Sequence, residues 1–250
     1  MRRLLVLLAI FAGVFAGSPA RADTMIADLS SHLIAINSSF DGDDVLMFGA
    51  VEGRGDVIVV VRGPEENLTI RRKERVGGIW VNNAYQTFND VPVFYAISAT
   101  RPIEELLPDA LDRKRHAIGF DQIAFKTGAE NRNVASDDVG TYIEALVRNK
   151  QRIGLYRYAV GDISIASGRL FRAPLHFPAN VPEGIYRVEV YHVRNGDILS
   201  AEITPLSISK VGLEFEVYDF ATRNGLAYGI LAVIIACFAG WLGNIAFRKS

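Results

Sequence analysis

The sequence predicts a mostly β protein, in which immunoglobulin-like sandwich units flank a short helical segment and one transmembrane helix ends the chain. Short apolar runs rich in β-branched residues, with turn residues about every eight to twelve positions, dominate residues 23–100 and 156–220. Within residues 101–155, apolar side chains recur at helical spacing instead. The last apolar stretch is long enough to cross a bilayer.

Composition excludes several classes of protein. Of the 250 residues, 50% are hydrophobic and 22% are charged, and the formal net charge is −1. A disordered or low-complexity chain is therefore excluded, and the charge gives no sign of a nucleic-acid binder. Cys237 is the single cysteine, which excludes a disulfide framework and a cysteine-rich metal site. Neither a phosphate-binding loop nor a dinucleotide fingerprint occurs, so we expect no cofactor.

Residues 1–22 are predicted to be a secretory signal peptide. Two arginines precede the apolar run Leu4–Phe15, and Ala20–Ala22 supplies a small-x-small cleavage site. The alternative is an uncleaved N-terminal anchor. The apolar run is short for a span and Gly17–Pro19 would interrupt a helix, so cleavage before Asp23 is favoured.

Residues 225–247 are predicted to form a transmembrane helix. Leu226–Phe247 contains no charged residue, and at ~1.5 Å per residue it covers about 33 Å. The alternative is a buried core helix, which its length and terminal position disfavour. Tyr228 and Trp241 lie towards opposite ends, where interfacial aromatic residues are expected.

The flanking charges predict the orientation. Residues 248–250 carry Arg248 and Lys249, which favour a cytoplasmic tail, while the signal peptide exports the preceding domain. We therefore expect a bacterial inner-membrane protein with its β-rich domain in the periplasm. The exported part has 28 acidic and 22 basic residues, which argues mildly against an extended polybasic lipid-binding surface.

The first β region contains two runs that are too short for helices, Val45–Phe48 and Val57–Val61. The intervening Gly53–Asp56 predicts a hairpin turn. In the helical segment, the helical spacing of apolar residues within 102–116 predicts two short helices or turns, interrupted by Pro108. Residues 137–153 predict the longest helix outside the membrane, because they combine an apolar stripe with acidic residues first and basic residues last.

The second β region reads as the closing hairpin of an immunoglobulin-like sandwich. Residues 186–193 alternate between two faces, and Asn195-Gly196 predicts a two-residue turn into the next strand. Leu206–Val217 predicts further β-structure. We favour two small sandwich units bridged by the helical segment, with one composite sandwich as the alternative.

The sequence offers no convincing catalytic motif. Ser207–Lys210 fits S-x-x-K and Lys126–Gly128 fits K-T-G, the pair that penicillin-binding enzymes use. The first lies in a predicted strand rather than at a helix start, the order along the chain is reversed, and no S-D-N triplet occurs. We therefore predict no catalytic residue.

The sequence evidence for a metal or anion site is equally weak. Asp41–Asp44 with Glu52 resembles a calcium loop, but Val45 and Leu46 occupy positions that require a ligand and a glycine, so an acidic turn is favoured. Two basic clusters could meet an anion, but solvated edges are the simpler interpretation. These clusters are Arg71–Lys73 with Arg75, and Arg113–Arg115. The histidines share no ligand spacing, and His192 is expected to be structural. They are His32, His116, His176 and His192.

The transmembrane segment carries the most specific pattern. Its small residues recur at intervals of 4, 3, 4, 4 and 3. At roughly 100° per residue they fall within about 80° on the helix, which favours close packing against another helix. Asn244 lies beside this stripe, where its amide could hydrogen-bond to a partner helix. The simpler alternative is ordinary membrane-helix composition. The stripe consists of Gly225, Gly229, Ala232, Ala236, Gly240 and Gly243.

Several stretches are together typical of one family: Pro92–Ala96, Thr100–Pro102, Leu170–Arg172, Phe177–Tyr186, and the C-terminal segment from Tyr228 to Arg248. They resemble the putative transmembrane protein family of alphaproteobacteria across essentially the whole mature chain. These motifs are structural, so the resemblance implies location and architecture and transfers no active-site residue. It also points to a permease as a partner for the membrane helix.

Two functions follow as hypotheses. The first is a non-enzymatic accessory or binding subunit, held in the bilayer by a helix that packs against a second copy or a multi-span permease. The alternative is a membrane-tethered hydrolase or ligand-binding enzyme, which would require a pocket lined by convergent polar groups.

Overall fold

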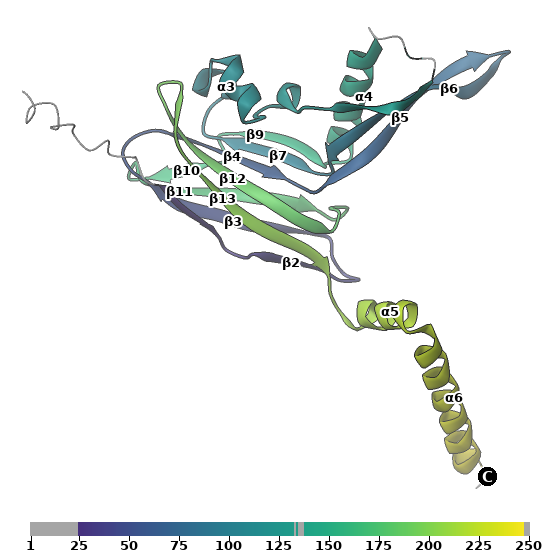
Figure 1. The fold of residues 1–250 in the computed structure, drawn as a ribbon. Helices are drawn as coiled ribbons and strands as arrows, with labels where there is room; N and C mark the ends of the chain where they lie inside the picture. The colour runs from purple at the N-terminus through teal and green to yellow at the C-terminus, as the bar shows by residue number, and fades with distance from the viewer. Residues whose placement is uncertain (1–24, 133, 135–137, 248–250) are drawn as a thin grey trace, which may run out of the picture.

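The computed structural model describes residues 25–132, 134 and 138–247, and it confirms the mostly β class (Figure 1). Among the described residues, about half lie in strands and about a quarter in helices. The predicted signal peptide and the tail at 248–250 lie outside the described residues. The more specific immunoglobulin-like assignment stays a prediction.

The described strands form three sheets. The first has the order β1 (Met25–Leu29), β3 (Gly42–Val51), β11 (Leu170–Pro178) and β10 (Ser164–Ala166). The second has the order β2 (Leu33–Ile36), β13 (Asp197–Lys210), β12 (Gly184–Arg194), β4 (Asp56–Arg62), β7 (Tyr95–Ala99) and β9 (Tyr156–Val160). The third has the order β5 (Glu65–Val76), β6 (Ile79–Pro92) and β8 (Lys126–Arg132). Neighbouring strands are antiparallel, apart from the parallel pairs β2–β13 and β7–β9.

The two β regions share their sheets, which corrects the prediction of two separate sandwich units. In the first sheet β3 pairs with β11, and in the second β4 lies between β12 and β7. Residues 23–100 and 156–220 therefore form one composite sandwich. The Gly53–Asp56 segment is likewise no hairpin turn, because it connects β3 in one sheet to β4 in the other.

The two β regions share their sheets because of β4, in which Val57–Val61 are all at most 1% exposed. A strand that is apolar on both faces needs neighbours on both edges and cover on both faces. Val59 and Val61 lie opposite Val190 and Val188 of β12 and face the first sheet. There the stacked rings of Phe94 and Phe177, with centroids 5.3 Å apart, fill the space between the sheets.

The other face of the second sheet is covered by the segment between β7 and β9. This segment contains α2 (Ile103–Leu106), α3 (Ala110–Arg115), the 3-10 turn η1 (Phe120–Gln122) and α4 (Val139–Arg152). The predicted helices are thus confirmed, although β8 is a strand within the range expected to be helical. The ring of Phe120 stacks on Tyr156 of β9, at 5.9 Å and an interplanar angle of 8°.

The chain leaves the sandwich through two helices, α5 (Leu213–Arg223) and α6 (Gly225–Phe247). The predicted membrane helix is confirmed as a helix, but the β-structure expected up to Val217 ends at Lys210. Lys210 pairs with Ile36, the last residue of β2, so no strand continues beside the chain beyond it. Leu213, Val217 and Phe220 then follow helical spacing. Figure 1 shows α6 extending away from the sheets.

Truncation of Phe177 tests the composite core. Its ring is 0% exposed and contacts Phe94 and Tyr186 across the two sheets. We expect Phe177→Ala to lower the free energy of unfolding by about 3–5 kcal/mol, because the loss of buried contacts leaves a cavity. Ile185→Ala, at a side chain that is 71% exposed, is the control. Equal effects of both substitutions on denaturant unfolding in detergent would contradict the packing described here.

Candidate functional site

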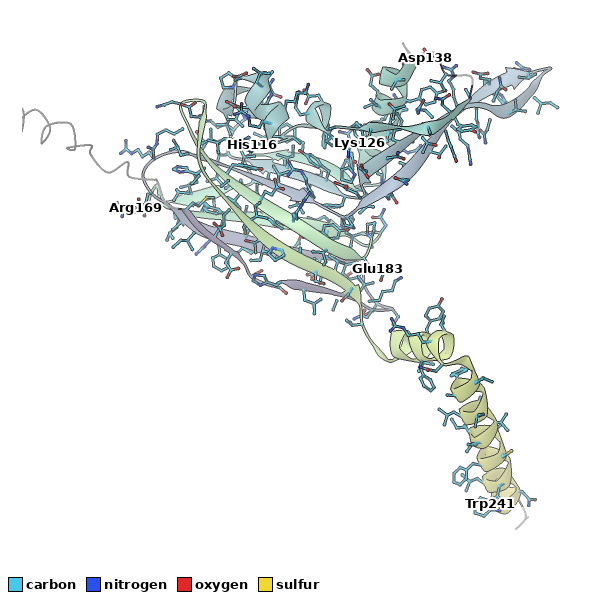
Figure 2. The ribbon with its side chains drawn as sticks, viewed as in Figure 1. His116, Lys126, Asp138, Arg169, Glu183 and Trp241 are labelled. Atoms are coloured by element: carbon cyan, nitrogen blue, oxygen red, sulfur yellow. The ribbon has the colours of Figure 1, made fainter. Side chains whose placement is uncertain are left out.

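The apolar helix α6 is the part of the chain that the sequence singled out. A 20-residue span, Gly225–Asn244, has a mean hydropathy of 2.1, and its most apolar window is 0% buried against the rest of the molecule. Trp241 lies near its far end (Figure 2), and Tyr228 near its start contacts the ring of Phe220 in α5, with centroids 6.4 Å apart. Length, composition and exposure together fit a helix surrounded by lipid.

The predicted stripe lies on one continuous helix, and the structure adds an observation about its glycines. A Cβ placed on Gly225, Gly229, Gly240 or Gly243 meets no atom within 4 Å beyond the immediate helix backbone. The protein's own fold therefore does not require small residues at these positions. Whether the stripe packs against another helix stays a prediction.

A buried ion pair, which the sequence analysis missed, lies on the face of the second sheet that the helical segment covers. The guanidinium of Arg62 donates to the carboxylate of Glu189, and their side chains are 13% and 8% exposed. Arg62 also donates to the carbonyls of His116 and Ala117. The available sequence signals were an arginine ending an otherwise buried strand and a glutamate within the alternating residues 186–193.

Neighbouring hydroxyl groups complete this cluster. Tyr191 donates to Glu189 at 2.6 Å, and Tyr95 donates to the carbonyl of Ala117 at 2.5 Å. Burial opposes the charge of Arg62, but the carboxylate of Glu189 outweighs it and raises the arginine pKa. Burial and the hydrogen bond to Glu189 raise the pKa of Tyr191. Neither shift moves a proton-transfer group towards neutral pH.

A cleft of about 420 Å³ opens beside this cluster, between the second sheet, the helical segment and the third sheet. Tyr95, Tyr191 and Ile203 contribute to its lining, and His116 and Lys126 mark it in Figure 2. Lys126 pairs with Asp90 at 2.7 Å, and Arg62 is paired with Glu189 and bonded to two backbone carbonyls. The charged groups here chiefly hold elements together.

A second hollow, of about 280 Å³, is lined by β3 and β11 of the first sheet and by β4, β7 and β9 of the second. Its floor includes Phe94 and Phe177, and its lining includes Ser98, Arg157 and His176. The Nδ1 atom of His176 lies 2.8 Å from a carboxylate oxygen of Asp44. A polar rim over an aromatic floor suits a small ligand with polar groups.

The remaining motifs do not assemble into a catalytic centre. Ser207 and Lys210 lie in β13, whereas Lys126 lies in β8 of another sheet, and Lys210 pairs with Glu183 at 3.4 Å. This arrangement lacks the helix-borne serine that the chemistry requires. Within the described part of the chain, no group of three or more His, Cys, Asp or Glu side chains is placed to hold a metal ion.

The four histidines lie in separate environments. His32 pairs with Asp28 at 3.0 Å, and the ring of His116 lies against Tyr191 at 5.4 Å. His192 is buried on β12, as expected for a structural residue, and His176 lines the second hollow. Cys237 is exposed on α6.

The basic clusters are only partly neutralised. Arg115 pairs with Asp112 at 3.2 Å, and Arg113 donates to the carbonyl of Leu107, the residue that ends α2, at 2.5 Å, so Arg113 joins α3 to the end of the preceding helix. In the other cluster, Arg72 pairs with Glu74 and Asp138, at 2.9 and 3.1 Å. Its neighbours Arg71, Lys73 and Arg75 make no ion pair with any described residue.

Comparison with known families decides the classification. Residues 24–249 match the family model described as “Putative transmembrane protein (Alph_Pro_TM)”. The chain belongs to this family. The match confirms the resemblance inferred from the sequence, and together with α6 it identifies a single-pass membrane protein. Comparison with curated proteins found no match.

The buried ion pair can be tested by a mutant cycle. We expect Arg62→Met to destabilise the fold by about 3–5 kcal/mol, because it leaves the Glu189 carboxylate buried without its cation. Arg62→Met with Glu189→Met should recover part of that loss, because no unpaired charge remains buried. Denaturant unfolding measures both variants. A loss below about 1 kcal/mol for the single variant, typical of exposed pairs, would show that the pair is hydrated.

Proposed function

We propose that this protein is a non-enzymatic accessory or binding subunit of an inner-membrane complex. Its β-domain lies in the periplasm, α6 crosses the membrane, and the small-residue stripe of α6 packs against a helix of a partner. The partner is a second copy of this chain or a multi-span permease. The observation that carries the proposal is the set of α6 glycines whose small size the chain's own packing does not explain.

Membrane physics supports a role for this stripe. In lipid, apolar side chains gain little by leaving one hydrocarbon environment for another, so helix association depends on close van der Waals contact and polar pairing. Glycine and alanine allow two backbones to approach closely. The bulky Ile234, Ile235 and Phe238 point away from the stripe and are 58–59% exposed, as expected for side chains facing lipid.

The orientation is supported by the two ends of the chain. The exported start follows from the signal-peptide pattern of residues 1–22, and the cytoplasmic end follows from Arg248 and Lys249. The ring pair of Phe220 and Tyr228 lies at the junction of α5 and α6, where a water–lipid boundary would place aromatic side chains.

A second candidate function is ligand binding or hydrolysis by the β-domain. The hollow beside His176 and Asp44 favours it, because it places polar groups over an aromatic floor. If His176→Ala abolished a hydrolytic activity of the purified protein, the enzymatic function would replace the accessory function.

Helix packing is tested by adding bulk to the stripe. Gly229→Ile with Gly240→Ile should abolish recovery of the partner after mild crosslinking in native membranes, because branched side chains separate the two backbones. Ala227→Ile with Cys237→Ile is the matched control, since it adds bulk outside the stripe. Co-purification followed by mass spectrometry measures recovery.

Each outcome of that experiment has a distinct meaning. A multi-span protein recovered with the native chain and with the control, but not with the stripe variant, identifies an accessory subunit. Recovery of only a second copy, lost in the stripe variant, identifies a homodimer. Unchanged association in the stripe variant would contradict the proposal.

A further inference from the structure

The distal part of the β5–β6 hairpin, residues 71–84, projects from the body of the molecule (Figure 1); it is called the arm below. Strand β8 pairs with β6 only between Tyr85 and Asn89, so the arm is a ribbon of two strands. The two-residue turn at its tip is formed by Gly77 and Gly78, with φ of 58° and 89°. An isolated two-stranded ribbon is marginally stable in water, and the ion pair of Arg72 with Asp138 ties the base of the arm to the start of α4, whereas its tip extends beyond this contact.

The tip of the arm is apolar and uncovered. Val76, Ile79 and Trp80 are 55%, 69% and 66% exposed. A Cβ added at Gly77 or Gly78 meets nothing within 4 Å. Adjacent exposed apolar side chains at the end of a projection are typical of a contact site.

One face of the arm also carries a row of cations. Arg71, Lys73 and Arg75 alternate along β5 and therefore share a face, and Trp80 lies opposite Arg75 in the register. None of the three cations makes an ion pair within the described chain. Arg72, on the other face, is held by Glu74 and Asp138.

The outer face of the first sheet holds a groove of about 590 Å³ that is mostly apolar. Ile26, Phe48 and Leu170 line it and are 74%, 42% and 56% exposed, and its charged lining residues are Asp28 and Arg172. The groove adjoins Arg169, whose label in Figure 2 lies at the end of the domain opposite to the arm. The arm therefore does not cover the groove of its own chain.

Charge separates the arm from the rest of the domain. The arm contains four basic residues and one acidic residue. The remainder of residues 25–210 contains 23 acidic and 17 basic residues, a net charge of −6. Two arms repel one another, whereas an arm and the body of another copy attract one another.

We propose that the tip of the arm docks in the outer groove of a second copy of this chain. Trp80, which shares a face with the row of cations, would enter the apolar groove, and the cations would face the acidic body around it. The two surfaces differ and lie at opposite ends of the domain, so the contact is head-to-tail and leaves one arm and one groove free for further copies. This association is separate from the helix packing proposed above.

The contact can be trapped by engineered disulfides in the full-length protein, in a Cys237→Ala background. Chains carrying Val76→Cys at the tip are mixed with differently tagged chains carrying Ala50→Cys in the groove, and oxidised in detergent. We expect a mixed dimer. Ala201→Cys, on an exposed position of β13, is the matched control and should give little product. A chain carrying both Val76→Cys and Ala50→Cys should form a ladder of higher species.

Further variants test the chemistry of the contact. Trp80→Ser in the tip chain, or Phe48→Ser in the groove chain, should abolish most of the mixed dimer. Arg71→Glu with Lys73→Glu and Arg75→Glu should reduce it, as should about 1 M NaCl, where the Debye length is only about 3 Å. The crosslink should persist with Gly229→Ile and Gly240→Ile, which separates this contact from helix packing.

Two outcomes would overturn the proposal. Equal yields with Ala50→Cys and Ala201→Cys would show random collision. Alternatively, the Trp80 fluorescence of a Trp241→Phe variant could shift to the blue on phosphatidylcholine–phosphatidylglycerol vesicles, at dilutions where no mixed dimer forms. That result would identify a lipid surface as the occupant of the arm.

Discussion

The fold depends on one constraint: strand β4 is apolar on both faces. Val57–Val61 can be removed from water only if β4 is central in its sheet and that sheet is covered twice. The first sheet supplies one cover, and the segment of residues 102–123 with α4 supplies the other. The interleaving of N-terminal and C-terminal strands follows, because β12 and β7 both come from outside the immediate neighbourhood of β4 in the chain.

Because both faces of the second sheet are covered, the charged residue Arg62 at the end of β4 needs a buried partner. Its side chain lies on the covered face, where a charge is costly unless it is paired and hydrogen-bonded. Glu189 supplies the opposite charge from β12, and the carbonyls of His116 and Ala117 accept two further hydrogen bonds from the guanidinium. The same contacts fix the turn after α3, where Ala117 has a φ of 47°. The ion pair thus joins the sheet to its cover.

The elements that the sequence predicted correctly are those encoded locally. The β12–β13 hairpin follows from Asn195 and Gly196, whose positive φ values suit a two-residue turn. The helix at α4 and the span at α6 follow from periodicity and length. What could not be predicted depends on partners distant in sequence: the connection at Gly53–Asp56 resembles a hairpin turn until β11 is known to pair with β3.

The candidate sites divide in the same way. The small residues of α6 share a face by helix geometry alone, so this face could be predicted from the sequence. The clefts could not, because strands from several regions of the chain line them. The arm combines both cases: the sequence showed its cations as a cluster, but it did not show their shared face or that they make no ion pair with a described residue. In the sandwich itself, the core strands bury their apolar side chains. Exposed apolar side chains gather on α6, on the arm and in the outer groove, three surfaces carried by different elements, although others such as Leu111 and Ile185 lie elsewhere. Two of these surfaces belong to the β-domain, so any contact they make is separate from the packing of the membrane helix.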